Sequence, residues 1–198
     1  MYEHICGRLT EKNPAYAVID CNGVGFFLHI SLYTYTALND QLKQAETCKL
    51  YTHLVVREDA MILYGFIDRQ ERALFRHLIS VNGVGSNTAR MILSSLTPGE
   101  ITEAVLNEHS ATLKSVKGIG AKSAQRIILD LKDKLKKETD PADILPSGHN
   151  TYRAEALSAL AMLGFHESVA ERALSKVLKT LPAESSVEDI IKEALKSL

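Results

Sequence analysis

Two short turns in the sequence have the composition of a phosphate-binding site. Each consists of a glycine, an apolar residue and a second glycine, at 83–85 and at 118–120, and apolar residues at helical spacing flank both. Glycine can adopt positive φ and lets another group approach the backbone closely. A helix that begins directly after such a turn presents unpaired N–H groups and the positive end of its dipole. Each turn is therefore predicted to bind a phosphate group at a helix N-terminus.

The two turns belong to a repeated unit. Residues 78–96 align with residues 113–131 without a gap, and Ala89 and Ala124 take equivalent positions. These small residues would let the two helices of each hairpin pack closely. A duplicated unit offers two phosphate sites at a fixed separation, which suits consecutive phosphates or both strands of a duplex across a groove. The pair resembles tandem helix-hairpin-helix DNA-binding motifs.

Local charge supports binding to a phosphate backbone, although the formal net charge of the whole chain is only −1. Between Lys114 and Lys137 there are eight basic residues and two acidic ones. Lys122 and Arg126, four residues apart, lie on one face of the helix expected to begin near Ala121. The predicted DNA contacts are Gly83, Val84, Gly85, Ser86, Asn87, Lys117, Gly118, Ile119, Gly120, Ala121, Lys122 and Arg126.

The segment that precedes the repeat has the pattern of β-structure. Period-two alternation and the Asn22-Gly23 turn signal indicate short strands, and Ser31–Leu38 is expected to form a turn or a short helix. The expected strands cover 5–10, 15–20, 24–30, 49–56 and 60–66. Five short strands within residues 1–67 favour a small closed barrel of the oligonucleotide-binding (OB) type.

From residue 68 onward the pattern is helical. Thr97, Pro98 and Glu100 form a capping-box signature for a helix that ends near Leu106, and Ser110 is expected to cap a short helix. The predicted fold class is multi-domain α+β. It comprises an N-terminal five-stranded OB-like β-barrel (1–67), a middle all-α tandem helix-hairpin-helix domain (68–137), a flexible linker (138–151) and a C-terminal three-helix bundle (152–198) similar to ubiquitin-associated (UBA) domains.

The C-terminal bundle has the composition of a protein-docking module. Its basic and acidic residues nearly balance, which is unlike a DNA-binding face. A domain of under fifty residues seldom buries all of its apolar side chains, so some of them are expected to form a partner surface. Leu160, Leu163 and Phe165 are the predicted partner-binding residues.

A charged turn, Arg57-Glu58-Asp59, separates the last two predicted strands. One interpretation is that this tip is simply solvated. In a chain that binds DNA backbone elsewhere, however, two carboxylates facing phosphates would weaken binding unless the repulsion is useful, for example to steer strands. The sequence leaves both interpretations open.

Other residues give no sign of catalysis or of a metal or cofactor site. There is no G-x-x-x-x-G-K-[ST] phosphate loop and no Ser/His/Asp constellation, and the seven histidines lack metal-ligand spacing. The three cysteines form no C-x-x-C pair, which favours reduced thiols in a cytoplasmic protein. No apolar run has membrane-span length, and no signal-peptide pattern is present.

The order of these features resembles the bacterial RuvA family of Holliday-junction-binding proteins, with residues 55–59 and 118–120 as the most specific motifs. The resemblance covers essentially the whole chain. It implies a fourfold-symmetric homotetramer, or two tetramers face to face as an octamer, that holds a four-way DNA junction open and square. It also implies that Glu58 and Asp59 form an acidic pin near the crossing phosphates.

The resemblance further implies that the bundle binds the hexameric ATPase RuvB, which drives branch migration, and that the junction resolvase RuvC acts in the same complex. The chain departs from the family where Ser86-Asn87 replace a common lysine, which leaves backbone N–H groups as the expected ligands of the first hairpin. The runner-up function is a helix-hairpin-helix DNA repair enzyme such as a glycosylase, although the spacing of Asp130 does not suit a catalytic residue. A purely structural scaffold is a third interpretation.

Overall fold

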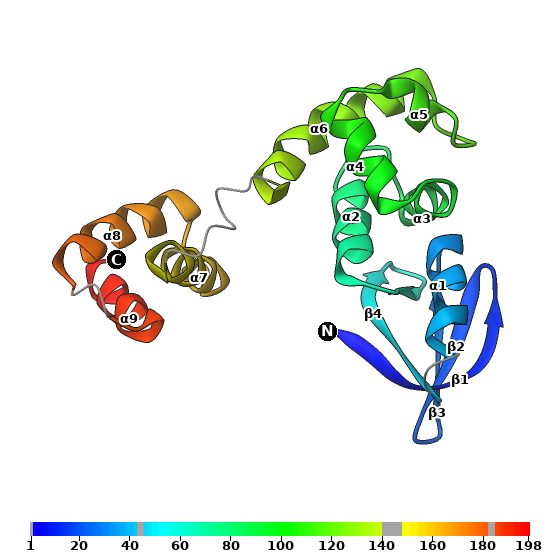
Figure 1. Cartoon of the computed structure of the whole chain (residues 1–198), viewed down its shortest axis with the longest axis horizontal. Helices are drawn as coiled ribbons and strands as arrows, with labels where there is room; N and C mark the ends of the chain where they lie inside the picture. Colours follow the sequence, from blue (N-terminus) through cyan, green and yellow to red (C-terminus); the bar gives the residue numbers. More distant parts are fainter. Residues whose placement is uncertain (1, 43–45, 140–147, 182–184) are drawn as a thin grey trace. The chain divides into compact units, whose positions relative to one another are not determined.

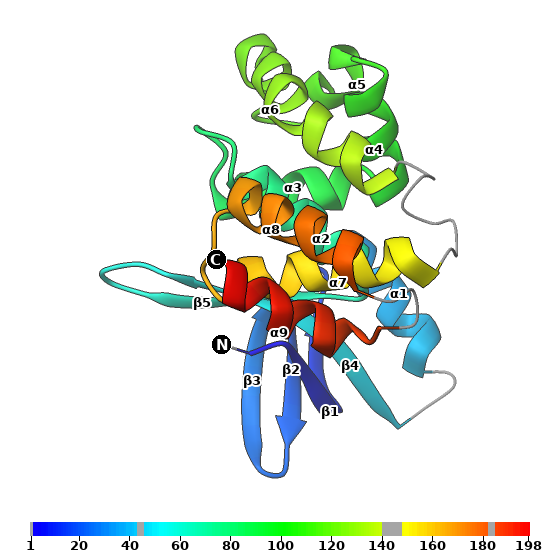
Figure 2. The same ribbon diagram turned by 90° about the vertical axis from the view of Figure 1, so that its left-hand side faces the viewer.

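The computed structural model describes residues 2–42, 46–139, 148–181 and 185–198. They divide into two compact units, Met1–Glu138 and Thr139–Leu198. The elements, labelled in Figure 1 except for β5, which is labelled in Figure 2, are β1 (His4–Asn13), β2 (Tyr16–Cys21), β3 (Val24–His29), α1 (Leu32–Leu42), β4 (Thr47–Val56), β5 (Met61–Phe66), α2 (Arg69–Ile79), α3 (Ser86–Ser95), α4 (Pro98–Leu106), α5 (Ser110–Lys114), α6 (Ala121–Thr139), α7 (Gly148–Met162), α8 (Glu167–Thr180) and α9 (Val187–Ser197).

The five strands form a closed barrel in the order β1-β2-β3-β5-β4, which confirms the predicted five-stranded barrel. Neighbouring strands are antiparallel except β3 and β5, which meet in parallel at His29 and Tyr64. The hairpin from β2 to β3 turns at Asn22 and Gly23, both with positive φ, as an Asn-Gly hairpin requires. The predicted turn or short helix after β3 is the longer helix α1, because Leu38 on it reaches the barrel core.

The helical part of the first unit contains the two predicted hairpins, α2–α3 and α5–α6, with α4 between them. Ala89 and Ala124 are fully buried, so the close helix packing expected from their size is confirmed. A single apolar core extends from Tyr64 and Phe66 of the barrel to Leu135 of α6. The two hairpins and one side of the barrel therefore share one packed interior, which holds the two turns at a fixed separation.

Helix ends in this region follow local capping chemistry. The Thr97–Glu100 capping box is present, and α4 ends at Leu106 as predicted. Ser110 is the first residue of α5, so the expectation that it caps this helix is wrong. The cause is a Schellman-type end of α4, in which Glu108 takes positive φ and the His109 N–H donates to the Ala104 oxygen at 2.8 Å. The chain therefore turns one residue earlier than the serine suggests.

A buried carboxylate joins the barrel to the helices. Glu71 of α2 accepts hydrogen bonds from the hydroxyls of Ser31 and Thr34 and from the backbone N–H of Ile67 at 3.1 Å. Its own N–H donates to the Asp68 carboxylate, which caps α2. Burial raises the pKa of Glu71 to about 7, against donors that stabilise the charged form. Residues from α1, the end of β5 and the start of α2 thus converge on one titratable group.

This raised pKa predicts a pH-dependent stability. Protonated Glu71 stabilises the folded state fully below its ordinary pKa of 4.5, and this stability is lost as pH rises through about 7. At 1.36 kcal/mol per unit the shift corresponds to roughly 3 kcal/mol. We expect the unfolding free energy to fall by about 2–3 kcal/mol more in wild type than in Glu71→Gln between pH 5 and pH 8, measured by urea denaturation at each pH.

Two histidines make the comparison with Glu71→Gln necessary. Burial, then nearby arginines, lower the pKa of His29 and of His53. A base with a lowered pKa makes stability rise with pH over its own window, the opposite direction to Glu71. Because the variant keeps both histidines, the difference between the two proteins isolates Glu71. Parallel pH profiles for wild type and variant would contradict the assignment.

The second unit is a three-helix bundle with a core of its own. Fully or nearly fully buried residues include Leu160 of α7, Leu174 of α8 and Ile190 of α9. Ser186 caps α9 by accepting from the Asp189 N–H at 3.2 Å. The predicted linker, 138–151, lies mostly on residues 140–147, which are outside the described residues. Its two ends are helical, because α6 extends to Thr139 and α7 begins at Gly148.

Candidate nucleic-acid interface

The second hairpin presents a helix N-terminus to solvent. Gly118 has φ +91°, and the Ile119 side chain below it is 6% exposed and packs in the core. The first intrahelical bond of α6 runs from the Ala124 N–H to the Gly120 oxygen at 3.0 Å. The N–H groups of residues 121–123 therefore precede the helical ladder, and Gly120, Ala121 and Lys122 are exposed beside them.

The space outside both turns is open. A Cβ atom placed on Gly83, Gly85, Gly118 or Gly120 would meet nothing within 4 Å. Positive φ is confined to the first glycine of each turn, Gly83 and Gly118, both at +91°. The first glycine is therefore required by the backbone, whereas the second leaves room for a group that approaches from outside.

Basic side chains surround the second turn. Lys117 and Lys122 are exposed. Arg126 is also exposed, with a long ion pair of 3.9 Å to Asp130 one turn further along α6, an interaction that solvent screens strongly. An incoming phosphate can replace this partner. Asp130 is thus engaged with a surface arginine, and its position gives no support to the glycosylase alternative.

The first hairpin differs from the second because the barrel covers part of it. Ser86 is 4% exposed, and its hydroxyl lies 3.0 Å from the Tyr64 hydroxyl and 3.4 Å from Nη2 of Arg57. Asn87 is exposed, with its Oδ1 3.4 Å from the Tyr64 hydroxyl. The Val84 side chain is buried like that of Ile119. For Val84, Ile119 and Ser86, therefore, only the backbone is in a position to contact DNA.

The supporting roles of Tyr64 and Arg57 were not anticipated from the sequence. Both residues lie more than twenty positions before Ser86, the residue that they contact. The only signal in the sequence is the serine itself, which stands where the second hairpin has Ala121. A polar residue at a position that becomes buried requires a hydrogen-bond partner.

The acidic turn lies at the tip of the β4–β5 hairpin, which extends away from the barrel (Figure 2). Val56 and Met61 form the last strand pair, and the Arg57 N–H donates to the Ala60 oxygen at 2.8 Å. Glu58 and Asp59 are exposed. Because Arg57 also approaches Ser86, the tip that presents these two carboxylates is linked to the first hairpin.

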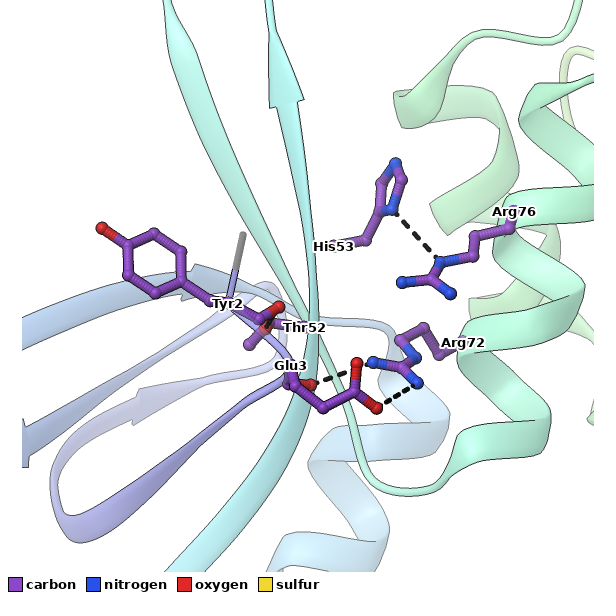
Figure 3. A network of polar contacts seen from close by, with 6 residues as sticks. All are labelled: Tyr2, Glu3, Thr52, His53, Arg72 and Arg76. Atoms are coloured by element: carbon purple, nitrogen blue, oxygen red, sulfur yellow. Dashed lines mark hydrogen bonds and ion pairs between the residues drawn. The ribbon is translucent and has the colours of Figure 1, made fainter. Parts of the chain in front are cut away.

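A polar network fixes the strand that leads to this tip (Figure 3). Arg72 of α2 donates to the carboxylate of Glu3 at 2.7 Å and to its backbone oxygen at 2.9 Å. Hydrogen bonding to Arg72 holds the pKa of Glu3 below its ordinary value. Arg76 approaches His53 Nδ1 at 3.4 Å, and Thr52 bonds to the segment before β1. These contacts connect β4 to α2, the first helix of the first hairpin.

Apolar side chains of the bundle fall into two groups. Leu160 is fully buried, and Phe165 is partly buried against the same core, so Leu160 itself is not available to a partner. Leu163 is 61% exposed, and its neighbour Met162, which is not among the predicted partner-binding residues, is 87% exposed. Met162 is the last residue of α7, and Leu163 follows it just before Gly164, which has φ +97°. They are the strongest candidates for a partner contact.

The arrangement of these residues suits binding to another molecule. Among the described residues, no group of three or more His, Cys, Asp or Glu could hold a metal ion. None of the helices in the described ranges is long and apolar enough to cross a membrane. What the first unit offers is two open turns, each beside a helix N-terminus, with basic side chains at one and a projecting acidic tip near the other.

A closed OB-like barrel followed by two helix-hairpin-helix units defines a DNA-binding protein of the helix-hairpin-helix class. Family models agree along the chain: the RuvA N terminal domain matches residues 1–65, the SAM-like helix-hairpin-helix tandem residues 75–133, and the RuvA C-terminal domain residues 152–198. The chain belongs to the RuvA family.

Similar proteins are alike over their full length. The chain is 53% identical to a protein of Christiangramia forsetii over 198 residues, 48% identical to one of Bacteroides fragilis over 206, and 47% identical to one of Flavobacterium psychrophilum over 198, with all of each chain covered. Each of these relatives is named Holliday junction branch migration complex subunit RuvA.

Proposed function

We propose that this chain is the junction-binding subunit of a branch migration complex. It binds four-way DNA junctions, holds them open and couples them to the ATPase RuvB during recombination and repair. The observation that carries the proposal is the pair of equivalent turns with open space above both second glycines, Gly85 and Gly120. One continuous core holds the two turns, so phosphate groups are received at a fixed separation.

The assembly that this function needs is a homotetramer. A four-way junction has four equivalent arms, and a fourfold ring of identical chains matches that symmetry. Each chain contributes two hairpins to one arm, and Glu58 and Asp59 of every chain form a pin near the centre. Their carboxylates repel the crossing phosphates and keep the strands apart. A second tetramer on the opposite face would enclose the same junction as an octamer.

The second unit contacts the motor. RuvB is its proposed partner, with Leu163 and Met162 in the contact and Phe165 supporting them from the core. The resolvase RuvC acts on the same junction. We propose that the chain is non-catalytic by itself, uses no cofactor and works in the cytoplasm with reduced cysteines.

A competition experiment tests this function directly. Labelled four-way junction bound to the protein is challenged with unlabelled junction or with linear duplex of the same total length. Junction should compete far better than duplex, whereas equal competition would contradict the proposal. A base-release assay on damaged duplex separates the glycosylase alternative, for which release of free base would be decisive.

The acidic pin yields a prediction of its own. Replacing Glu58 by Gln and Asp59 by Asn removes two charges near phosphates, so linear duplex should bind roughly fivefold more tightly at low salt, with a smaller gain as salt rises. The preference for junction over duplex should fall accordingly. The measurement is duplex and junction affinity at two salt concentrations.

The matched control neutralises two exposed carboxylates elsewhere in the same unit, Glu46→Gln with Glu103→Gln. This control changes the net charge equally and should leave the junction preference unchanged. If the pin variant and the control behave alike, the tip is only a solvated turn.

A further inference from the structure

Two aromatic side chains, the exposed Phe27 and the half-buried Tyr16, lie on the outer face of β2 and β3. The rings of Tyr16 and Phe27 stack with centroids 4.7 Å apart and planes 23° apart. Phe27 is 49% exposed. The strand register places these two rings on the face opposite to the fully buried Ala17 and Leu28. An outward strand position of a barrel is ordinarily polar, whereas the half-exposed phenylalanine stacked on a tyrosine gives this face a flat apolar surface on which a ligand could stack.

The rings continue from this face to the first hairpin. His29 lies edge-on to Phe27, with centroids 5.2 Å apart, and 5.6 Å from the Tyr64 ring. Tyr64 in turn contacts the Ser86 hydroxyl at the start of α3. We call Tyr16, Phe27, His29 and Tyr64 the ring strip. It joins the exposed stack to the turn whose N–H groups are proposed to bind phosphate.

An arginine on α3 fixes the strip to that helix. Nη1 of Arg90 donates to the Ala15 oxygen at 3.0 Å and lies 3.3 Å from Nδ1 of His29. Burial, then the Arg90 charge, lowers the pKa of His29, which favours the neutral ring that can accept from Arg90. The exposed stack therefore has a fixed position relative to α3, one helical turn beyond the first hairpin.

The charge of the surrounding face suits bases better than phosphates. Arg8 lies opposite Asp20, whose carboxylate also accepts from the Gly23 N–H at 2.9 Å, and Glu11 lies opposite Val18. Together with Arg90, these residues give the face around the ring strip a net charge near zero, so it does not attract a polyanion by charge. The exposed half of the Phe27 side chain is apolar and aromatic, as is the face of an unpaired nucleobase.

We propose that the outer part of the ring strip, the stacked rings of Tyr16 and Phe27, binds unpaired bases of single-stranded DNA by stacking, while His29 and the buried Tyr64 hold these rings in place. The same face of strands 2 and 3 can bind oligonucleotides in OB-type barrels, and bases stack on aromatic side chains with little sequence preference. Paired bases have their faces covered by their neighbours, so only unpaired bases qualify. Branch migration breaks base pairs as it proceeds, so unpaired bases form beside the protein, and in this respect the inference rests on the proposed function. The phosphates of the unpaired strand would lie at the first hairpin, and its freed bases would lie on the strip.

The test measures binding of a fluorescein-labelled 20-nucleotide oligo-dT by anisotropy, with the full chain. Phe27→Ala should weaken this binding roughly 5- to 100-fold, and Phe27→Tyr should restore it. Val24→Ala, which removes an apolar side chain that is 57% exposed on the same hairpin, should leave it unchanged. Thermal melting verifies that each variant is folded. We expect Phe27→Ala to fold, because the Phe27 side chain is half exposed and its removal leaves no buried cavity.

The alternative occupant of this face is a second copy of the chain. Sedimentation of wild type and Phe27→Ala decides between the two. A fall in oligomer mass for Phe27→Ala would overturn the proposal and make the face a subunit interface. Oligo-dT binding that does not depend on Phe27, in a protein that still prefers junction to duplex, would overturn the ring strip alone. Phe27-dependent oligo-dT binding without any junction preference would instead overturn the proposed function.

Discussion

A chain that ends at Thr139 is expected to bind four-way junctions as well as the full chain and to lose ATP-driven branch migration completely. All proposed DNA contacts lie in the first unit, Met1–Glu138, which has its own cores. The second unit has a separate core, so its removal leaves the first folded. The measurement is junction affinity by gel shift beside branch migration with the cognate ATPase.

A variant of the full chain sharpens this test. Met162→Ser with Leu163→Ser removes the two exposed apolar side chains at the end of α7 and should reduce both migration and pull-down of the ATPase. Leu195→Ser, a residue of α9 that is 41% exposed, is the matched control and should retain both. Full migration by the chain that ends at Thr139 would show that the bundle is not the motor contact.

The second large effect is expected at the second hairpin. Gly120→Val should fold normally, because a Cβ there meets nothing within 4 Å and φ is not positive. The added side chain would, however, stand between the phosphate and the N–H groups of α6. Loss of one charge-assisted hydrogen bond weakens binding by about 1.5–3 kcal/mol, roughly 10- to 100-fold. Junction affinity by gel shift at fixed salt measures the loss.

Two other glycines separate this effect from damage to the fold. Gly99 of α4 also has open space at its Cβ position and no positive φ, so Gly99→Val should bind junctions far better than Gly120→Val does. Gly118→Val should instead lower stability, because φ at this position is +91° and a β-branched residue rarely adopts it. Equal junction affinity for Gly120→Val and Gly99→Val would contradict the phosphate site.

Salt dependence tests the contribution of charge at the same hairpin. Lys122→Glu should weaken junction binding and flatten its dependence on salt, because each lost phosphate contact reduces the slope by about one unit. In a tetramer every chain loses the contact, so the slope changes by several units. An unchanged slope would show that Lys122 does not face the DNA.

Much of the fold could be predicted because local patterns determine it. The alternating segments around Asn22-Gly23 close into the barrel, since strand pairing follows the turn type. The repeat at 78–96 and 113–131 predicted two equivalent turns, and Gly83 and Gly118 have the same φ. The capping box at Thr97 required only residues within one helical turn.

Features that depend on distant contacts were not predictable from the sequence. Serine at the first position of a helix is usually exposed, but Ser86 is buried because Tyr64 and Arg57 of the barrel lie against it. The sequence predicts both Leu160 and Leu163 as partner-binding residues. In the structure Leu160 is fully buried, whereas Leu163 is 61% exposed. Which side of a helix faces its neighbours depends on the packing of the whole bundle, and the sequence of one helix does not specify it.

The chain is proposed to hold a four-way junction open, and the angle between the junction's arms reports whether it does. A junction labelled with a fluorescence donor and acceptor on two neighbouring arms folds into stacked pairs of arms in magnesium. Addition of the protein should shift the energy transfer to the value of an open, square junction, and the chain that ends at Thr139 should give the same shift. Tight binding that leaves the arms stacked would contradict the claim.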